Sequence, residues 1–436
     1  MGTKVQTVIG LGFGDEGKGR MVDYLTRQYN DWIWNVKFTS GAQAAHYVHT
    51  DEGIVHCFSQ FGSGTFAGAR TYLTKYFMWN PISLVFEAAA LISKGIENPL
   101  DRVYIDGRAS TITPFHVAAN RIRERINNHG SCGKGVGELA RDNANGYTPI
   151  FASDLLGDPK VLADKLKEIQ IRKVEELLDL HVDWDMMTIT LQNEVDILLD
   201  VNRSVKMAAI YQEMVKDFTI VSDYDQMYKS FFEQGVVFEG AQGVLLDEWH
   251  GFHPYTTWAT TTHVNVQEIM KDAGYDGPHE IVGVTRSYHT RHGEGPFPTE
   301  NPEFIPVHTE NNSTGIWQGV FRYGHLDLIL LKYATDCVKH YIKDNENFVL
   351  AITHMDRIKK TPLTLTHKRA YIKPSFDHNL LHQTQLSNEL NKSISKDDIM
   401  GISDLEYFLI VVNYAADTKI KYLGLGPSAK DTEVIP

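Results

Sequence analysis

The stretch Gly10-Leu-Gly-Phe-Gly-Asp-Glu-Gly-Lys-Gly-Arg-Met-Val-Asp23 decides the expected fold. An apolar run at 5–9 leads into it and predicts a short buried strand, and the apolar spacing over 21–25 predicts a helix behind it. Strand, glycine loop and helix together form a phosphate-binding arrangement, because glycines let backbone N–H groups close around an anion at the positive end of the helix dipole. Lys18 would supply a point charge on a phosphate oxygen.

The loop departs from an ordinary P-loop at two positions. Gly12, Gly17 and Lys18 fit the G-x-x-x-x-G-K pattern, but Gly19 stands where a Ser or Thr hydroxyl normally binds Mg²⁺. Asp15 adds a carboxylate that can ligate Mg²⁺ or act as a base on a substrate. A plain strand-to-helix turn with Asp15 as the helix N-cap is the structural alternative. Five glycines with Asp, Glu and Lys in ten residues favour the functional interpretation.

Composition limits the class of protein. The chain has 436 residues, 42% of them hydrophobic, and its formal net charge is −13, which argues against a general binder of nucleic acid or anionic membranes. Three widely spaced cysteines without a Cys-x-x-Cys pair fit a reducing cytoplasm. No apolar run reaches the ~18 residues of a membrane span. We therefore expect a soluble cytoplasmic α/β protein that binds neither nucleic acid nor membrane.

The segment Gly14-Asp-Glu-Gly-Lys-Gly19, followed by Val-Asp at 22–23, resembles the opening of adenylosuccinate synthetases. Those enzymes join L-aspartate to the 6-position of inosine monophosphate (IMP) with GTP. The resemblance continues through Phe238-Glu-Gly-Ala-Gln-Gly-Val-Leu-Leu-Asp247 and Gly295-Pro-Phe-Pro-Thr-Glu300. It implies one α/β domain over residues 1–436, with a P-loop-like GTP-binding fold. A large, mainly parallel central sheet would carry helices on both faces and a helical excursion over roughly 155–232.

The resemblance also implies the catalytic residues. Asp15 would remove the N1 proton of the purine, Lys18 would neutralise the transferred phosphate, and His46 would stabilise the 6-oxygen as charge develops there. Gln242 would hydrogen-bond the base or its 6-phosphoryl group, since an amide offers donor and acceptor. Mg²⁺ would bind Asp15 and the backbone carbonyl of Ala45. The loop residues expected to bind the donor nucleotide are Gly14, Glu16, Gly17 and Gly19.

Contacts to the substrate nucleotide diverge from the family. Gln43 replaces an Asn that helps hold the substrate phosphate, and Ser131 and Cys132 stand where the family has two threonines. A thiol is a weak donor, so Ser131 or a backbone N–H would take over that contact. Thr257 matches the family threonine that touches the phosphate. His292 stands where an apolar residue contacts the ribose, which could change the preference between ribose and deoxyribose.

The amino-acid loop differs most. The family has four consecutive arginines here, which bind both carboxylates of aspartate, whereas this chain keeps one arginine, Arg322. One bidentate arginine still holds a carboxylate strongly. The second carboxylate needs another donor, and the candidates are Ser313, Thr314, Gln318 or the N–H groups of the loop. The amino acid is therefore aspartate held differently, or another amino acid.

Two further matches concern the phosphoryl donor. Asp356 follows an apolar strand at 350–353 and would pair with the two adjacent donors of guanine, which favours GTP over ATP. Gly426 and Pro427 resemble a turn that lies against the same base. Family members are homodimers whose partner sends an arginine to the substrate phosphate. The resemblance therefore implies a homodimer. Arg141 is the nearest candidate for that phosphate-binding arginine, but it does not align cleanly with the family's residue.

Two alternatives stay open. Related bacteriophage enzymes act on deoxyguanylate (dGMP) and often carry a smaller residue than Asp at the loop carboxylate, so Asp15 favours IMP while the altered loops favour a specialised enzyme. A non-catalytic nucleotide sensor is the second alternative. A GTPase switch would need Ser or Thr in place of Gly19. The arginines within 115–126 are expected on a solvated face, and 359–396 is expected to form surface excursions without function.

Overall fold

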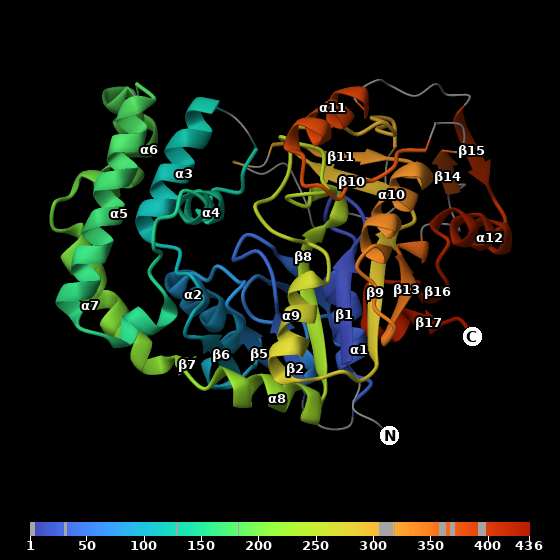
Figure 1. The fold of residues 1–436 in the computed structure, drawn as a ribbon, viewed down its shortest axis with the longest axis horizontal. Helices are drawn as coiled ribbons and strands as arrows, with labels where there is room; N and C mark the ends of the chain where they lie inside the picture. The colour runs from blue at the N-terminus through green and yellow to red at the C-terminus, as the bar shows by residue number, and fades with distance from the viewer. Residues whose placement is uncertain are drawn as a thin grey trace.

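The computed structural model describes residues 5–29, 33–127, 130–181, 183–304, 317, 319–356, 363–366, 371–390 and 398–436. Its centre is a ten-stranded sheet (Figure 1). Across the sheet the strands are β17 (Thr432–Val434), β16 (Ile420–Gly424), β13 (Glu346–Thr353), β9 (His279–Arg286), β1 (Val5–Gly10), β8 (Val236–Gly243), β2 (Trp34–Lys37), β5 (Arg70–Leu73), β6 (Val103–Asp106) and β7 (Thr219–Val221). Only β17 runs antiparallel to its neighbour, so the predicted mainly parallel sheet is confirmed.

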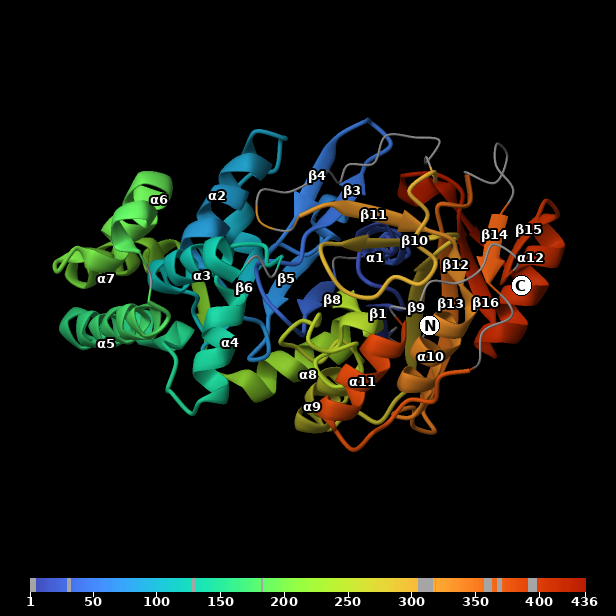
Figure 2. The ribbon, with the colours of Figure 1, turned by 90° about the horizontal axis from the view of Figure 1, so that it is seen from above.

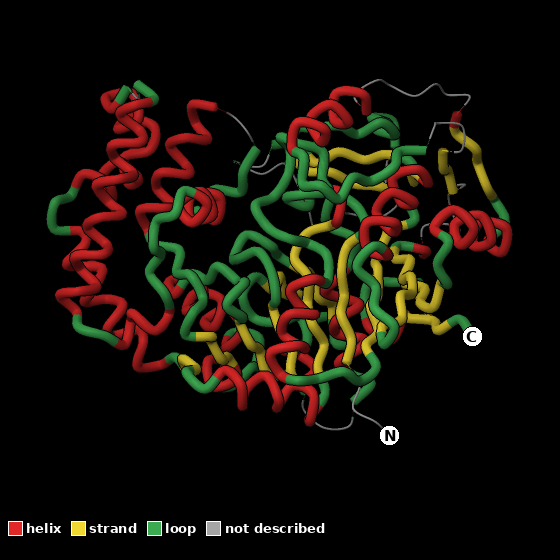
Figure 3. Tube along the Cα trace, viewed as in Figure 1, coloured by secondary structure: helices red, strands yellow, loops and turns green. Residues whose placement is uncertain are grey.

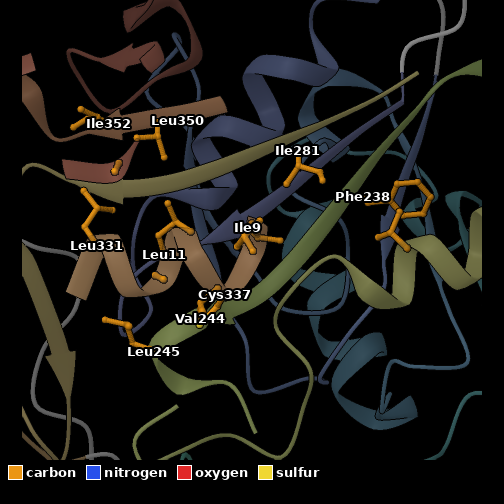
Figure 4. Close-up of a cluster of buried hydrophobic side chains, with 14 of the residues drawn as sticks. Ile9, Leu11, Phe238, Val244, Leu245, Ile281, Leu331, Cys337, Leu350 and Ile352 are labelled. Carbon is orange, nitrogen blue, oxygen red and sulfur yellow. The ribbon is translucent and has the colours of Figure 1, made fainter. Parts of the chain in front are cut away.

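The sheet is covered on both faces, as a parallel sheet requires. Successive residues of β1 enter separate hydrophobic clusters: Val8 packs with Val22 of α1 (Lys18–Thr26), and Ile9 packs on the opposite face. That second face is covered by α8 (Tyr224–Gln234), α9 (Val264–Ala273) and α10 (Leu328–Lys339). Figure 2 shows these three helices on one side of the sheet and α1 on the other. Figure 4 shows Ile9 and Ile281 of the strands near Leu331 and Cys337 of α10.

A helical arm extends beyond the β7 edge (Figures 1 and 3). It contains α3 (Pro114–Asn127), α4 (Val136–Ala144), α5 (Pro159–Asp179), α6 (Trp184–Leu199) and α7 (Arg203–Met214). The predicted excursion over 155–232 is mostly helical, but α5 packs mainly on α7 and α6 mainly on α3, and neither packs mainly on the sheet. The same stretch also contains β7 and α8, which return the chain to the sheet. The arm therefore borders the sheet edge and carries α3 and α4 toward the loops above it.

Smaller elements gather above the carboxyl ends of the central strands. Two of them are two-stranded antiparallel sheets. One pairs β3 (His46–His49) with β4 (Val55–Phe58), and the other pairs β10 (His289–His292) with β11 (Phe321–Gly324). A three-stranded sheet contains β12 (Leu326–Asp327), β14 (Leu363–Thr366) and β15 (Ile399–Ile402), and the remaining helices are α2 (Pro81–Ile92), α11 (Leu380–Leu390) and α12 (Leu405–Ala416). In the described part of the chain, every helix is too short or too polar to cross a membrane.

Candidate active site

A cleft of about 810 Å³ lies where β1 and β8 end, large enough for a nucleotide. It is lined by the first glycine loop, the segment leading into β3, the second glycine loop, the segment after β8 and the end of β10. The sequence-predicted residues that line it are Gly14, Asp15, Gln43, Ala45, His46, Ser131, Cys132, Gln242, Thr257 and His292. A second cavity of about 800 Å³ lies at the opposite ends of the strands, around Gln6, Glu280 and Lys421, away from the predicted site residues.

The first loop is organised around Glu16, whose side chain turns inward. Its Oε1 accepts hydrogen bonds from the backbone N–H groups of Gly12 (3.0 Å) and Gly14 (2.8 Å), and its Oε2 accepts one from Lys18 Nζ at 2.5 Å. Both charged side chains are almost fully buried. A Cβ at Gly243 would lie 2.2 Å from Oε1, so glycine is needed where β8 passes this carboxylate. The carboxylate of Glu16 is therefore engaged inside the loop in this structure, and its backbone N–H is the group that we expect to contact a nucleotide.

Packing explains why Gly19 replaces the P-loop hydroxyl. A Cβ on Gly19 would lie 2.8 Å from the Cβ of His46 and 3.0 Å from the carbonyl oxygen of Tyr47. The start of β3 crosses directly over the first turn of α1, so neither Ser nor Thr fits there. The loop loses a metal-binding hydroxyl, and the same packing places His46 beside it.

His46 is held by a buried glutamate that sequence reasoning missed. Its Nδ1 lies 2.6 Å from Glu239 Oε1, and its Nε2 lies 3.0 Å from the carbonyl oxygen of Ala241. Because both neighbours are acceptors, both contacts are hydrogen bonds only when the ring carries two protons. Burial lowers the pKa of His46 and opposes that second proton, against the pull of Glu239. A second proton of this kind suits a group that donates to a developing oxygen anion.

Glu239 is a charge centre beneath the cleft. Its carboxylate also lies 3.3 Å from Lys37 Nζ and accepts hydrogen bonds from the Ser63 backbone N–H (2.9 Å) and hydroxyl (2.7 Å). Burial alone would raise the pKa of the Glu239 carboxyl, but Lys37, His46 and these hydrogen bonds hold it well below its usual value. The Glu in the Phe-Glu-Gly-Ala-Gln-Gly motif was the available sequence signal.

Asp15 occupies a partly buried bend of the first loop. Its φ is 59°, a left-handed conformation that Asp tolerates better than most residues, and Arg286 donates a hydrogen bond to its carbonyl oxygen. Its Oδ2 lies 3.3 Å from Nε2 of His292, which closes β10. Burial alone would raise the pKa of the Asp15 carboxyl, but the hydrogen bond from His292 and nearby positive charges hold it below its usual value. Asp15 is thus ionised, as a general base must be. The helix begins after Gly17, so Asp15 is not its N-cap.

Two amides in the cleft have oxygens that need donors. Oε1 of Gln242 and Oε1 of Gln43 are buried and have no hydrogen-bond partner among the described residues. Gln43 is oriented by a hydrogen bond from its Nε2 to the Ser40 hydroxyl. Buried amide oxygens without donors are costly, which is consistent with a ligand supplying N–H or O–H groups here.

The second glycine loop is tied to α3. The Ser131 hydroxyl accepts a hydrogen bond from Asn120 Nδ2 at 2.9 Å, and burial raises the pKa of the Cys132 thiol to about 11. Cys132 therefore stays protonated and supplies at most a weak donor. The hydroxyl of Ser131, which faces the same cleft, is the stronger candidate for a phosphate contact.

The prediction that the α3 arginines form a solvated face holds for Arg125, which is exposed, but was wrong for Arg121 and Arg123. Arg121 pairs with Glu194 of α6 at 2.6 Å, and Arg123 pairs with Glu138 of α4 at 2.8 Å and lines the cleft. Arg141 also pairs with Glu138, at 3.1 Å. The acidic partners come from helices that pack on α3 only in the folded arm, so the local charge pattern gave no signal for them.

The residues expected at the donor base lie on the other side of the first loop. Nε of Arg20, two residues after Lys18, donates to the carbonyl oxygen of Gly426 at 2.7 Å. Burial lowers the pKa of Arg20 to about 10, although the nearby carboxylate of Asp356 acts in the opposite direction. Asp356 and the turn at Gly426 and Pro427 are thereby brought to the start of α1. This is the position that a nucleotide base needs if its phosphates are to reach the loop.

The amino-acid loop is described only in part. Ser313, Thr314 and Gln318 lie outside the described residues. Arg322 lies on β11, where Nη1 pairs with Glu300 at 2.8 Å and Nη2 donates to the Gly295 carbonyl at 2.9 Å. Its guanidinium is therefore engaged by Glu300 and Gly295 and does not line the cleft in this structure.

The prediction that 359–396 forms only surface excursions was wrong for its described part. Leu380, at the start of α11, lines the cleft. The segment before it is anchored by stacked rings: His378 on Trp249, with ring centres 4.5 Å apart, and Phe376 on His340, 3.6 Å apart. These aromatic residues in a polar stretch were the only sequence signal that the segment packs on the site.

The expected Mg²⁺ is consistent with the donor set. Asp15 offers a carboxylate and Ala45 a backbone carbonyl, and both line the cleft. In the described part of the chain, no three His, Cys, Asp or Glu side chains cluster as a complete metal cage. Mg²⁺ commonly binds through one or two protein oxygens and takes its other ligands from water and substrate phosphates, so such a cage is not required.

Comparisons with known proteins point to one family. A family model for adenylosuccinate synthetase matches residues 7–371. Adenylosuccinate synthetase from Francisella tularensis subsp. mediasiatica is 28% identical over 351 residues, covering 76% of this chain and 74% of the relative, and that of Francisella philomiragia is 29% identical over 348 residues with the same coverage.

Two solved structures share the fold. Fully ligated adenylosuccinate synthetase from Plasmodium falciparum matches with a TM-score of 0.69 at 19% identity, over 99% of this chain and all of that one. Cyanophage S-2L succinoaminodeoxyadenylate synthetase, bound to dGMP and to dATP as an energy donor, matches with a TM-score of 0.60 at 15% identity, over 100% of this chain and 96% of that one.

Proposed function

Because this chain belongs to the adenylosuccinate synthetase family, a family of ligases that form a C–N bond, we propose that it joins L-aspartate to C6 of IMP. GTP would supply the phosphoryl group, and the products would be adenylosuccinate, GDP and phosphate. The observation that carries the proposal is the common cleft, which brings Asp15, His46 and Gln242 together beside the first glycine loop. In this proposal residues 1–436 act as one catalytic domain.

In the first step Asp15 removes the N1 proton, and the 6-oxygen of the purine attacks the γ-phosphate of GTP. The lowered pKa of Asp15 keeps it ionised for this task, and its Oδ1 has no hydrogen-bond partner among the described residues. Lys18 and the loop N–H groups neutralise the transferred phosphate. Lys18 must then share its charge between Glu16 and the phosphate, since the two side chains are paired in this structure.

In the second step the amine of aspartate displaces phosphate from C6. His46, oriented by Glu239, donates through Nε2 to the departing oxygen, and Gln242 holds the purine or its phosphoryl group with the amide whose oxygen lacks a partner. Mg²⁺, held by Asp15 and the Ala45 carbonyl, would supply positive charge to the phosphates. Ser131 and Thr257 would hold the 5′-phosphate of IMP, with Gln43 beside them.

The amino acid would be held by Ser313, Thr314 and Arg322. Arg322 would exchange its pairing with Glu300 for a substrate carboxylate, an exchange between two partners of the same chemical kind. Asp356, Gly426 and Pro427 would hold the guanine of GTP. A carboxylate suits guanine and not adenine, which is why GTP is preferred here over ATP.

We further propose a homodimer whose second copy contributes an arginine to the 5′-phosphate. In support, Arg123 and Arg141 line the cleft but both share the carboxylate of Glu138, which reduces the charge they can offer a phosphate. Sedimentation of the purified protein with and without IMP tests the dimer. A monomer under both conditions would contradict it.

The test of the function is phosphate release from GTP and from ATP, with L-aspartate, comparing IMP with dGMP. We expect release with GTP, aspartate and IMP, and a product with the absorbance of adenylosuccinate. Asp15→Asn, which keeps the shape and removes the base, should abolish it. Faster release with dGMP would instead support the bacteriophage-type activity. Nucleotide binding without aspartate-dependent release would support the sensor.

A further inference from the structure

The side chain of His292, at the end of β10, lies against the carboxylate of Asp15, the base in the proposed reaction. Its Nε2 lies 3.3 Å from Asp15 Oδ2, and its ring packs on Phe321 of the neighbouring strand with ring centres 4.5 Å apart. In the pairing of β10 with β11, His292 lies opposite Phe321, and Phe13 of the first loop forms a β-bridge with Arg291. These two strands are therefore fixed against the loop. His292 and Asp15 both line the cleft. The contact is therefore held by the framework and faces the ligand space.

The contact with His292 makes the surroundings of the two Asp15 oxygens different. Oδ2 faces His292, while Oδ1 has no hydrogen-bond partner among the described residues. A carboxylate with both oxygens open to a ligand matches two parallel N–H donors, and a side chain lying against one oxygen takes up part of that oxygen's accepting capacity. Asp15 thus offers the base one oxygen free of contacts and one that His292 already shares.

We propose that His292 is a specificity-determining residue that, by occupying one oxygen of Asp15, selects 6-oxopurines without a 2-amino group. This inference rests on the proposed function. Hypoxanthine presents one donor, N1–H, on this edge, and Oδ1 satisfies it. Guanine presents N1–H and an adjacent 2-amino group. The 2-amino N–H would point at Oδ2 and compete there with Nε2 of His292, 3.3 Å from the same oxygen.

The penalty for the guanine base follows from that collision. Either the 2-amino group shares Oδ2 with His292 at poor geometry, or His292 is displaced from Asp15 and loses its own acceptor. A buried polar group left unpaired typically lowers kcat/KM by about 10- to 100-fold relative to the matched ligand. His292 thus discriminates at the 2-position, although the family resemblance had placed it at the sugar edge.

The experiment measures kcat/KM for IMP and for dGMP in the wild-type protein and in His292→Ala, with GTP and aspartate. GMP is included so that the 2′-hydroxyl is separated from the 2-amino group. We expect the wild type to prefer IMP over both, and His292→Ala to reduce that preference by at least about tenfold, mainly through faster use of GMP and dGMP. A merely structural defect would lower all three rates together and leave the ratios unchanged.

Two variants sharpen the test. His292→Gln retains an N–H donor that can reach Asp15 and should keep most of the preference, whereas His292→Phe retains the ring on Phe321 and should lose it. His253→Ala removes a histidine of the same cleft whose contacts, in the described part of the chain, do not include Asp15, and should leave the ratios unchanged.

Calorimetric affinities for IMP, GMP and dGMP are measured in parallel. An unchanged IMP preference in His292→Ala, or a wild type that prefers dGMP, would overturn the role of His292 while leaving the ligase activity standing. Absence of turnover with every nucleotide would overturn the proposed function. The three affinities in wild type and His292→Ala would then still decide whether His292 discriminates at the 2-position.

Discussion

Replacing Glu239 with Gln is expected to destabilise the protein by about 3–5 kcal/mol and to abolish turnover. The carboxylate lies 3.3 Å from Lys37 Nζ and 2.6 Å from His46 Nδ1, and all three side chains are more than nine-tenths buried. In the described part of the chain Lys37 has no other carboxylate within 4.0 Å. A glutamine therefore leaves one buried ammonium unpaired and His46 without the charge that orients it.

A double variant separates the two consequences. Lys37→Met with Glu239→Gln removes both charges of the pair, and replacing a buried ion pair by residues of similar volume is often close to neutral. We expect its free energy of unfolding to return to within about 1 kcal/mol of wild type. Turnover should stay low, because His46 still lacks its carboxylate. Urea unfolding followed by tryptophan fluorescence and the phosphate-release assay provide the two readouts.

Glu280→Gln is the matched control. Glu280 lies on β9, which is also a neighbour of β1, and pairs with Lys421, but these side chains are 18% and 31% exposed. Such a pair contributes about 0–1 kcal/mol, so the control should unfold close to wild type. The reasoning is refuted if Glu239→Gln costs no more than Glu280→Gln, or if the double variant recovers no stability.

Three further outcomes follow from single sites. Gly19→Ser should lower the melting temperature and the rate of phosphate release together, because its Cβ would lie 2.8 Å from the Cβ of His46. Burial alone would raise the pKa of the Asp142 carboxyl, but hydrogen bonds hold it below its unfolded value of about 3.9. The ionised Asp142 therefore stabilises the folded protein fully above about pH 4, and this stabilisation is lost as the pH falls below that value. Asp142→Asn should flatten the acid-induced fall of the urea midpoint. In a Cys57→Ser variant, the rate of alkylation of Cys132, whose pKa is about 11, should rise about tenfold per pH unit up to about pH 10. IMP should slow this alkylation, and mass spectrometry measures both effects.

The sequence predicted the central framework well because its strands are continuous apolar runs. The runs at 5–9 and 350–353 became part of β1 and β13, which both lie inside the ten-stranded sheet. Parallel strands buried on both faces carry this signal in their own residues. By contrast β7 has three residues at the sheet edge, too short for any periodicity to mark it.

Motif order predicted residues that the fold brings to one cleft, among them Asp15, His46 and Gln242, and their roles stay predictions. It was not predictable where function depends on which way a side chain turns. Glu16 was expected to bind nucleotide, but its carboxylate fills the loop interior because three glycines leave room for it. His292 and Asp15 are 277 positions apart and meet only because β10 lies against the first loop. No local pattern carries such a contact.

The departure at Gly19 explains why this loop supports a ligase and not a nucleotide switch. A P-loop hydroxyl at that position would serve the metal alone, and it would occupy the space that the start of β3 needs. With glycine there, His46 lies beside the loop, and the left-handed bend at Asp15 places a carboxylate on the cleft side of the same loop. In the proposed function the loop N–H groups bind the donor phosphate while Asp15 and His46 act on a second substrate. One short motif thus serves both reactants, which is what transfer of a phosphoryl group to a purine oxygen requires and hydrolysis by water does not.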